Sequence, residues 1–443
     1  MPFVKRSIII FILSFFVLSS SSHAYERFMG YTIKPGVNLR SGPGLNFKVK
    51  EKLRHNRTVF AGDKSKEWVN VITDTGVEGY VHYSLISDLW IKIYKDERFL
   101  IMMKGDNEIK RYSVALCPFN PDKDKIKQGD GGTPEGRFYI CEMLENPGAP
   151  KYGARSMRLS YPGIEDAGRG LRDKLINYET YKGILKDIHQ GIMPSQGTVL
   201  GGSIRIHGGG SGRDWTLGCA ALDDEDIIEI FNRVKPGTRV EVYRNEKQDK
   251  QINSSGYLSR LVLEGAKKQL VKPALYTKNA AGLIKLSYPM GDITEKEAVC
   301  TDIVIRALRH AGADLQALLH EEIILRPELY RNIKNPDYNI DHRRTRNLQT
   351  FFSNNAMTVF NGKGDPDKTK IKPGDIVILD TGIKNGTVYD HIGIIDDEPD
   401  ASGWYRVINI WTTGYRTESM SLLGHDYPEV TGIFRLSHPF DYQ

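Results

Sequence analysis

Residues 29–87 alternate short apolar and polar runs with glycine and proline turns. Successive side chains of a β-strand point to opposite faces, so a period of two predicts half-buried strands. Strand-like runs of this kind occur at 48–53, 57–63 and 67–74, and no helical period appears between them. The pattern predicts a small all-β domain over residues 27–87.

The next stretch, residues 88–243, also favours strands, which are separated by longer loops. The strand-like runs are LWIKIY at 89–94, RFLIMM at 98–103, YSVAL at 112–116, GRFYI at 136–140, SIRIH at 203–207 and RVEVY at 239–243. Helical periodicity is confined to parts of 165–190 and to 223–234, where four acidic residues favour the N-terminal end of a helix. This region predicts a mostly-β domain with a short helix near its end.

A polar segment, residues 244–257, has almost no apolar side chains and is interpreted as a linker. Residues 258–440 then form a third unit. Helical periodicity at 256–270 and 298–312 precedes three strand-like runs, KPGDIVIL, DHIGII and RVINIW. Helical segments followed by strand-like runs predict an α+β domain. Together with the two preceding units, this domain makes the whole chain a predicted multidomain protein.

The first 24 residues have the pattern of a secretory signal. Lys5 and Arg6 precede an apolar run from Ile8 to Leu18, and small residues end the segment at Ala24. That run of 11 residues is too short to span a bilayer as a helix. We expect cleavage after Ala24, no stable membrane span afterwards, and export to the periplasm or cell envelope. An uncleaved anchor is the alternative.

Charge and composition narrow the function classes. Loss of Lys5 and Arg6 lowers the formal net charge from +6 to +4, because residues 1–24 contain no Asp or Glu. So small an excess does not indicate nucleic-acid binding, although it suits an anionic cell wall. The sequence contains neither a Cys-x-x-Cys nor a His-Glu-x-x-His motif. No metal and no cofactor are expected.

The segment from 203 to 226 carries the strongest candidate chemistry. A strand-like run ends at His207, and a glycine-rich loop leads to Thr216, Leu217, Gly218 and Cys219. A histidine can take the thiol proton, and the exposed thiolate can then attack a carbonyl carbon. Backbone amides near Gly218 and Cys219 are placed to face the oxyanion that forms. The alternative is a buried structural cysteine beside a structural histidine.

These residues resemble the YkuD-type L,D-transpeptidase family, whose signature is a His-Gly, a variable loop and Ser/Thr-x-Gly-Cys. Segments GDGGTPEGRFYI (129–140) and RSMRLSYP (155–162) resemble further family motifs. The resemblance spans roughly residues 88–243 and implies the following roles. Cys219 is the nucleophile, His207 is its base, the Gly208 carbonyl orients the imidazole, and Thr216 and Gly218 shape the turn.

Two positions depart from the family pattern. Leu217 stands where a second histidine is common, and Ala221 stands where Arg or Asn is common. Both departures concern the acceptor side of the pocket. The balance between transfer to an amine and hydrolysis by water is therefore left open.

Within residues 27–87, the pieces GVNLRSGPG, EWVNV and GYVHYSLI resemble bacterial SH3-like domains of envelope enzymes. The resemblance implies that this domain binds wall peptides or holds the enzyme in place. A purely structural barrel is the alternative, and no residue here has a catalytic pattern.

The third unit contains a second candidate site. Cys300 lies early in a predicted helix, and His391 and Asn409 follow on strand-like runs, which is the papain-like order of parts. The unit resembles the NlpC-type papain-like cell-wall peptidase superfamily. Thr294 and Glu297 predict a capping box that starts the helix one turn before Cys300. The alternative is that Cys300 is a buried helix residue.

Two cysteines remain outside these patterns. Cys117 and Cys141 end or lie in strand-like runs of the same expected sheet. A disulfide between them and a pair of free buried thiols are both open.

Together the sequence predicts a secreted wall enzyme that acts on peptidoglycan stem peptides through a Cys219 acyl-enzyme. The third unit is expected to be a cysteine peptidase or amidase that contributes to wall remodelling. An L,D-carboxypeptidase or peptidoglycan hydrolase is the first alternative, and a non-catalytic wall-binding scaffold is the second. No nucleic-acid partner is expected, and the sequence points to no particular protein partner.

Overall fold

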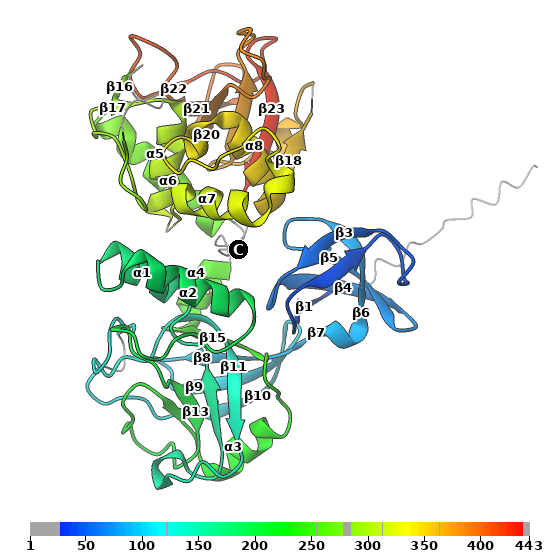
Figure 1. Cartoon of the computed structure of the whole chain (residues 1–443), viewed down its shortest axis with the longest axis vertical. Coiled ribbons are helices and arrows are strands. Elements are labelled where there is room, and N and C mark those ends of the chain that lie inside the picture. Colours follow the sequence, from blue (N-terminus) through cyan, green and yellow to red (C-terminus); the bar gives the residue numbers. More distant parts are fainter. Residues whose placement is uncertain are drawn as a thin grey trace, which may run out of the picture.

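The computed structural model describes residues 27–120, 123–253, 256–277, 285–311, 313–362 and 364–436. The predicted signal, residues 1–24, lies outside the described residues. Three larger β-sheets and one two-stranded sheet organise the described residues. In Figure 1 the sheet of the C-terminal part lies at the top, the N-terminal sheet at the right, and the sheet of residues 89–243 at the bottom.

The N-terminal sheet is small and strongly bent. Its order is β3-β2-β6-β5-β4-β1-β7. The strands are β1 (Phe28–Thr32), β2 (Val37–Arg40), β3 (Val49–Leu53), β4 (Thr58–Ser65), β5 (Trp68–Thr73), β6 (Glu78–His82) and β7 (Ile86–Ser87). Alternate residues such as Val69 and Val71 point inward and are buried with Leu39 and Leu53. The all-β expectation for this segment is confirmed.

The second sheet has eight strands in the order β10-β9-β8-β15-β11-β12-β13-β14. The strands are β8 (Leu89–Tyr94), β9 (Phe99–Lys104), β10 (Asn107–Ser113), β11 (Gly136–Leu144), β12 (Ser156–Leu159), β13 (Arg205–His207), β14 (Ala220–Ala221) and β15 (Arg239–Tyr243). Three helices accompany it: α1 (Ile164–Arg172), α2 (Tyr178–His189) and α3 (Asp224–Phe231). The mostly-β expectation for this region is confirmed.

A buried arginine ties this sheet to the N-terminal one. Arg239 of β15 is fully buried. It donates from Nε to Asn56 Oδ1 at 2.7 Å and from Nη1 to Thr58 Oγ1 at 3.1 Å. Its guanidinium lies 4.7 Å from the centre of the Tyr31 ring. Because a buried charge needs satisfied hydrogen bonds, this contact fixes the two sheets against each other.

The polar segment 244–257, which the sequence analysis interprets as a linker, contains a helix. Helix α4 (Glu246–Asn253) buries Asp249, which accepts a hydrogen bond from Lys92 Nζ at 2.7 Å. Tyr94 donates a second hydrogen bond to the same carboxylate. The sequence pattern hides this anchoring because the helix is held by one buried polar residue and not by an apolar stripe.

The C-terminal part combines helices with a six-stranded antiparallel sheet of order β18-β23-β19-β20-β21-β22. The strands are β18 (Met357–Asn361), β19 (Ile376–Asp380), β20 (His391–Pro399), β21 (Tyr405–Asn409), β22 (Glu418–Met420) and β23 (Glu429–Arg435), with a separate pair β16 (Leu275–Tyr276) and β17 (Glu297–Ala298). The helices are α5 (Tyr257–Val271), α6 (Cys300–His310), α7 (Leu315–Leu325) and α8 (Thr345–Asn355). Helices α5 and α6 pack on each other and on β20. The papain-like resemblance of this part stays a prediction.

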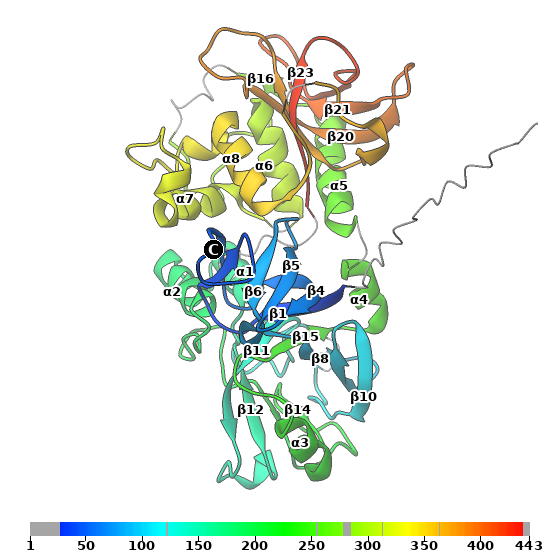
Figure 2. The ribbon, with the colours of Figure 1, turned by 90° about the vertical axis from the view of Figure 1, so that its right-hand side faces the viewer.

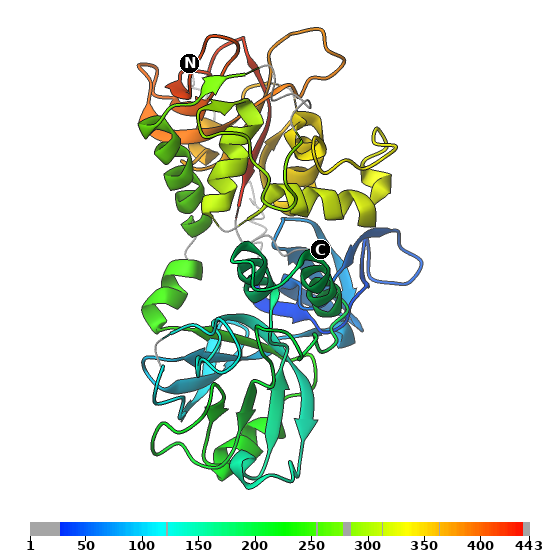
Figure 3. The same ribbon diagram turned by 60° about the vertical axis from the view of Figure 1, so that its left-hand side comes forward.

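Helices α1 and α2 join the second sheet to the C-terminal part. Figures 1 and 3 show both helices between the two. Tyr181, Ile184 and Leu185 belong to the same apolar core as Leu258 and Leu318 of the C-terminal part. Because they share this core, the second sheet and the C-terminal part are packed against each other and are not independent domains joined only by a linker.

Within the described ranges, no helix has both the length and the apolar character that a membrane span requires.

We expect Ile184→Ala to destabilise the junction. Ile184 is fully buried in the shared core, and an Ile→Ala change at such a site costs about 2–5 kcal/mol of unfolding free energy. Denaturant unfolding of the full chain measures this change. The matched control is Ile192→Ala, because Ile192 is 49% exposed and its truncation should change the free energy by less than about 0.5 kcal/mol. Equal effects of the two substitutions would contradict a junction held by apolar burial.

Candidate active sites

The first candidate site lies where β13 and β14 pair in parallel. His207 is the last residue of β13 and pairs with Ala221, while Ile206 pairs with Ala220. Cys219 immediately precedes β14. The pairing therefore brings Cys219 and His207 onto adjoining chain segments, although 11 residues of loop separate them.

The Cys219 thiol is partly buried. Its sulfur lies 3.8 Å from the Ser203 carbonyl oxygen. Burial raises the pKa of the Cys219 thiol, and the main-chain N–H and guanidinium of Arg205 oppose that rise, as do Lys151 and Lys125. Desolvation disfavours a thiolate, whereas nearby positive charge favours it. The resting group is a thiol with cations arranged around it.

His207 is held in a defined tautomer. Its Nδ1 lies 2.6 Å from the Gly208 carbonyl oxygen, and because a carbonyl only accepts, Nδ1 carries the proton. Nε2 is then the acceptor nitrogen. The ring packs edge-on against Tyr152, 5.1 Å between centres, and Trp215, 5.6 Å. Burial lowers the pKa of His207, so the imidazole is neutral at pH 7 and can take a proton.

The turn before Cys219 depends on glycine and threonine. Thr216 donates from Oγ1 to the Cys219 carbonyl oxygen at 2.7 Å. Gly218 has φ +119°, and a Cβ added there would lie 2.8 Å from the Gly132 carbonyl oxygen. Only glycine combines that backbone conformation with so close an approach. The predicted shaping residues therefore adjoin Cys219 directly.

Gly208 is constrained for a different reason. A Cβ added to it would lie 2.1 Å from Asp224 Oδ1. That oxygen accepts hydrogen bonds from Gly209 N at 3.0 Å and Ala154 N at 2.8 Å. The first residue of α3 thus holds the loop that carries the carbonyl partner of His207.

The two departures from the family motif flank Cys219. Leu217 is 79% exposed, whereas Ala221 is fully buried. Neither side chain offers a polar group to an incoming acceptor.

Sequence reasoning missed Arg205, Tyr152 and Trp215. Arg205 stands two residues before His207 on β13 and so shares its face. The ring of Tyr152 contacts both side chains. The period of two could have identified Arg205, but the aromatic contacts arise from loops and had no local signal.

The second candidate site gathers three predicted residues from three elements. Cys300 is the first residue of α6, His391 the first of β20 and Asn409 the last of β21. His391 Nε2 lies 3.0 Å from Asn409 Oδ1, so that ring nitrogen carries the proton and donates. The Ile392 main-chain N–H is directed at the Cys300 sulfur. Cysteine, histidine and asparagine therefore lie in one region of the C-terminal part.

The predicted capping box at Thr294 and Glu297 is wrong. Glu297 belongs to β17, and α6 begins at Cys300. Asp302 caps the helix instead, because its carboxylate accepts from Val299 N at 2.8 Å and pairs with Arg343 at 2.7 Å. The sulfur therefore lies at the helix N-terminus, where the dipole favours a thiolate.

Burial works against that dipole at the second site. It raises the pKa of Cys300 to about 11 and lowers the pKa of His391 to about 4. Thiol and neutral imidazole are the resting forms at pH 7. Such a pair transfers its proton only as the thiol attacks.

All four cysteines are free thiols in the structure, so Cys117 and Cys141 are not bridged there. Among the residues that are described, no cluster of three or more His, Cys, Asp or Glu side chains is arranged to hold a metal ion.

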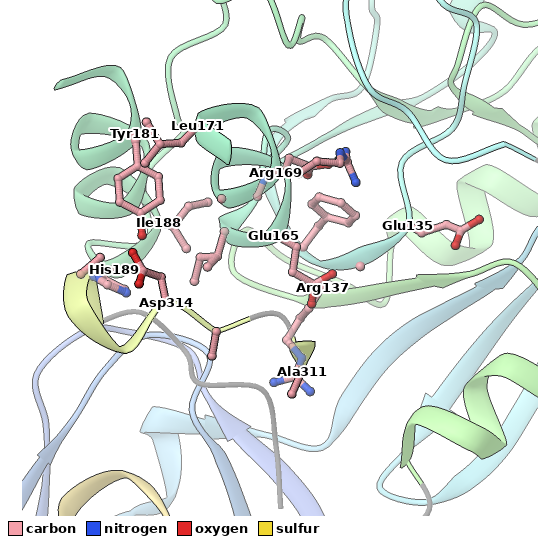
Figure 4. Close-up of a pocket in the computed structure, with 18 of the residues that line it drawn as sticks. Glu135, Arg137, Glu165, Arg169, Leu171, Tyr181, Ile188, His189, Ala311 and Asp314 are labelled. Atoms are coloured by element: carbon pink, nitrogen blue, oxygen red, sulfur yellow. The ribbon is translucent and has the colours of Figure 1, made fainter. Parts of the chain in front are cut away.

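A cavity of about 450 Å³ lies at the junction of the three parts. His55, Arg169 and Asp314 are among its lining residues, one from each part. Figure 4 shows Tyr181, Ile188, His189 and Asp314 on one side and Arg137 with Ala311 on another. Cys219 and Cys300 do not line it.

Comparison with known proteins agrees with this geometry. Residues 88–242 match the model of the L,D-transpeptidase catalytic domain, and residues 35–87 match that of the bacterial SH3 domain. Residues 263–436 match a domain of unknown function, DUF1287. A relative, "Uncharacterized protein YijF" of Escherichia coli (strain K12), is 34% identical to this chain over 174 residues. The matched region covers 37% of this chain and 78% of YijF.

The chain is thus a multidomain protein that contains an L,D-transpeptidase catalytic domain. More particularly, the chain belongs to the DUF1287 family through its C-terminal part, with a bacterial SH3 domain preceding the catalytic domain.

Solved structures share less with this chain. Helical cell shape determining protein Pgp2 from Campylobacter jejuni is 22% identical with a TM-score of 0.27, over 41% of this chain and 59% of Pgp2. Bd1075 of Bdellovibrio bacteriovorus is 18% identical with a TM-score of 0.25, over 42% of this chain and 60% of Bd1075. The chain therefore spans less than two thirds of either structure.

We expect Gly218→Ala to abolish chemistry at Cys219 without unfolding the domain. The added methyl group meets the Gly132 carbonyl oxygen at a backbone conformation unfavourable to alanine, which costs about 1–3 kcal/mol and displaces the thiol. Mass spectrometry of Cys219 acylation measures the loss, and circular dichroism reports the fold. In the same loop, Gly212 has open space around it, so Gly212→Ala is the control that should keep the wild-type rate. Equal acylation of the two variants would show that the turn does not position the thiol.

Proposed function

We propose that the first site is a peptidoglycan L,D-transpeptidase centre with Cys219 as nucleophile and His207 as general base. The Cys219 thiol gives its proton to His207 Nε2, and the sulfur attacks the donor carbonyl carbon. The C–N bond to the terminal D-residue breaks, and His207 returns the proton to that leaving amine. The product is a thioester between the donor stem and Cys219.

The second half of the proposed reaction regenerates the enzyme. An amine of a neighbouring stem attacks the thioester carbonyl, with His207 accepting the amine proton. The C–S bond breaks, a new amide bond forms, and the Cys219 sulfur regains a proton. No metal or cofactor takes part in either half. The reaction is proposed to take place in the cell envelope after export.

The observation that carries this proposal is the fixed tautomer of His207. With Nδ1–H donated to the Gly208 carbonyl, only Nε2 is free to accept a proton. Because burial lowers the pKa of His207, the base is unprotonated at pH 7. The L,D-transpeptidase domain match over residues 88–242 supports the substrate class.

Hydrolysis of the same acyl-enzyme is the alternative outcome. Exposed Leu217 and buried Ala221 leave the acceptor side without the polar groups common in the family. Water needs less positioning by the protein than a stem-peptide amine does. These two side chains favour an L,D-carboxypeptidase as the second candidate for this site.

Incubation of the purified protein with a muropeptide that carries a tetrapeptide stem tests the first site. We expect wild-type protein to gain the mass of the acyl group and Cys219→Ala to gain none. Turnover should fall by at least about a thousandfold, because the nucleophile is removed. Dimeric products indicate transfer, and tripeptide monomers indicate hydrolysis.

Cys141→Ala is the matched control for that experiment. Cys141 is a partly buried free thiol on β11 and belongs to neither site, so its loss should leave acylation unchanged. Full turnover by Cys219→Ala would contradict the proposal and favour the second site, whereas neither acylation nor turnover by wild-type protein would favour a wall-binding scaffold.

The second site is proposed to hydrolyse an amide of the same polymer. Cys300 would attack a carbonyl carbon, His391 would move the proton, and Asn409 would orient the imidazole. The observation that favours this function is the 3.0 Å contact of His391 Nε2 with Asn409 Oδ1, which leaves Nδ1 as the ring nitrogen that can accept a proton. Water then cleaves the thioester and restores the thiol.

A variant pair separates the second activity from the first. We expect Cys219→Ala to retain cleavage of purified peptidoglycan and the double variant Cys219→Ala/Cys300→Ala to lose it. The products are measured by chromatography with mass detection. Because Cys300 lies against the apolar core, Cys300→Ser with intact circular dichroism guards against loss by unfolding. Identical digests from the single and double variants would exclude hydrolysis at Cys300.

A further inference from the structure

We propose that Arg205 is a positioning residue that favours the thiolate form of Cys219 during acylation. The inference rests on the proposed role of Cys219 and goes beyond it, because it assigns a residue that lies outside the His-Gly and Thr-x-Gly-Cys motifs. The guanidinium acts through the sulfur and is not proposed to contact the reacting carbonyl.

Arg205 occupies the right place in the sheet. It begins β13, two residues before His207, and continuing the β13–β14 register by one residue sets it beside Cys219. Its side chain points to the same face as His207, because alternate residues of a strand share a face. The Tyr152 ring confirms that shared face: it lies 5.3 Å from the Arg205 guanidinium and 5.1 Å from the His207 ring.

The guanidinium is buried and held at both ends. Arg205 is 3% exposed. Nη1 donates to Ser156 Oγ at 3.0 Å, and Nη2 donates to the Glu142 carboxylate. A charge removed from water interacts more strongly with its neighbours, since little solvent screens it. The two hydrogen bonds keep it from turning outward to solvent.

The positive charge of Arg205 shifts the pKa values of Cys219 and His207 in the same direction. The Arg205 guanidinium lowers the pKa of Cys219 and also lowers the pKa of His207. It thereby stabilises the anion that attacks and disfavours a protonated imidazole. Lys151 acts in the same direction on both groups, and Lys125 on the thiol. Glu142 opposes them, because its carboxylate partly neutralises Arg205.

A second arginine provides a matched comparison. Arg158 of β12 pairs in register with Arg205, and its Nη2 lies 3.3 Å from the same Glu142 carboxylate. Its Nη1 contacts Met193 Sδ at 3.3 Å. Arg158 lowers the pKa of Cys141, and its strand β12 lies one position farther from β14 than the strand of Arg205. Two arginines therefore share one carboxylate, and Arg205 is the one on the strand that pairs with the segment of Cys219.

The test measures the ionisation of Cys219 without turnover. The full-length protein is alkylated with iodoacetamide at a series of pH values, and the rate is followed on tryptic peptide 214–233, in which Cys219 is the single cysteine. We expect Arg205→Met to slow alkylation at pH 7 about tenfold, the result of a one-unit rise in thiol pKa. Arg205→Lys restores the charge and should recover part of that rate, whereas Arg158→Met should match wild type.

Glu142→Gln gives a prediction of the opposite sign. It leaves the Arg205 charge unopposed, so alkylation at pH 7 should become faster than in wild type. If Arg205→Met loses its circular dichroism signal, Glu142→Gln decides the question alone. An unchanged rate in Glu142→Gln, or equal slowing by Arg205→Met and Arg158→Met, would overturn the proposal.

Substrate kinetics exclude the other role open to a buried arginine. A guanidinium that binds a substrate carboxylate predicts a raised KM with an unchanged alkylation profile, and that pattern would also overturn the proposal. Failure of the proposed function looks different. In that case muropeptide never acylates wild-type Cys219, while the alkylation rates still follow the charge at position 205.

Discussion

In the catalytic sheet, β13 and β14 pair in parallel over two residues, and the first site is assembled by that contact. Parallel neighbours cannot be joined by a tight hairpin, so the chain needs the long glycine-rich loop to return beside itself. Gly218 and Gly208 make the return possible where a side chain would collide with Gly132 or Asp224. Backbone pairing sets the segments that carry the Cys219 thiol and the His207 imidazole side by side.

Both candidate thiols face the same opposition between burial and charge. A dry site strengthens every interaction with a reacting group, but it also disfavours the thiolate. At the C-terminal site Cys300 lies at the start of α6, whereas at Cys219 the positive charges of Arg205, Lys151 and Lys125 oppose the effect of burial. One constraint is therefore met by a backbone dipole in one domain and by a buried side chain in the other.

Packing between the domains determines how the two sites are arranged. The α1–α2 pair shares its core with the C-terminal part, and Arg239 anchors the N-terminal sheet. Figure 2 shows β14 and α3 near the lower end and α6 in the upper part, so the two sites belong to separate regions of the molecule. The junction cavity is lined by neither Cys219 nor Cys300.

Local sequence determined the elements with strong periodicity. The period of two identified β8 and β15 to the residue, and the helical period identified α5 and α6 within two residues. Motif spacing also singled out His207, Cys219, Cys300, His391 and Asn409 as candidates. The helical period missed α7, which is apolar on most sides. The predicted capping box started α6 too early, because the observed capping interaction uses Asp302 and the distant Arg343. Tertiary structure alone decided that α4 is anchored by Asp249, that α1 and α2 dock on the C-terminal part, and that Arg205 lies beside Cys219. Periodicity reports which way a side chain points along its own element, whereas these contacts join residues far apart in the chain and exist only after the sheets have packed.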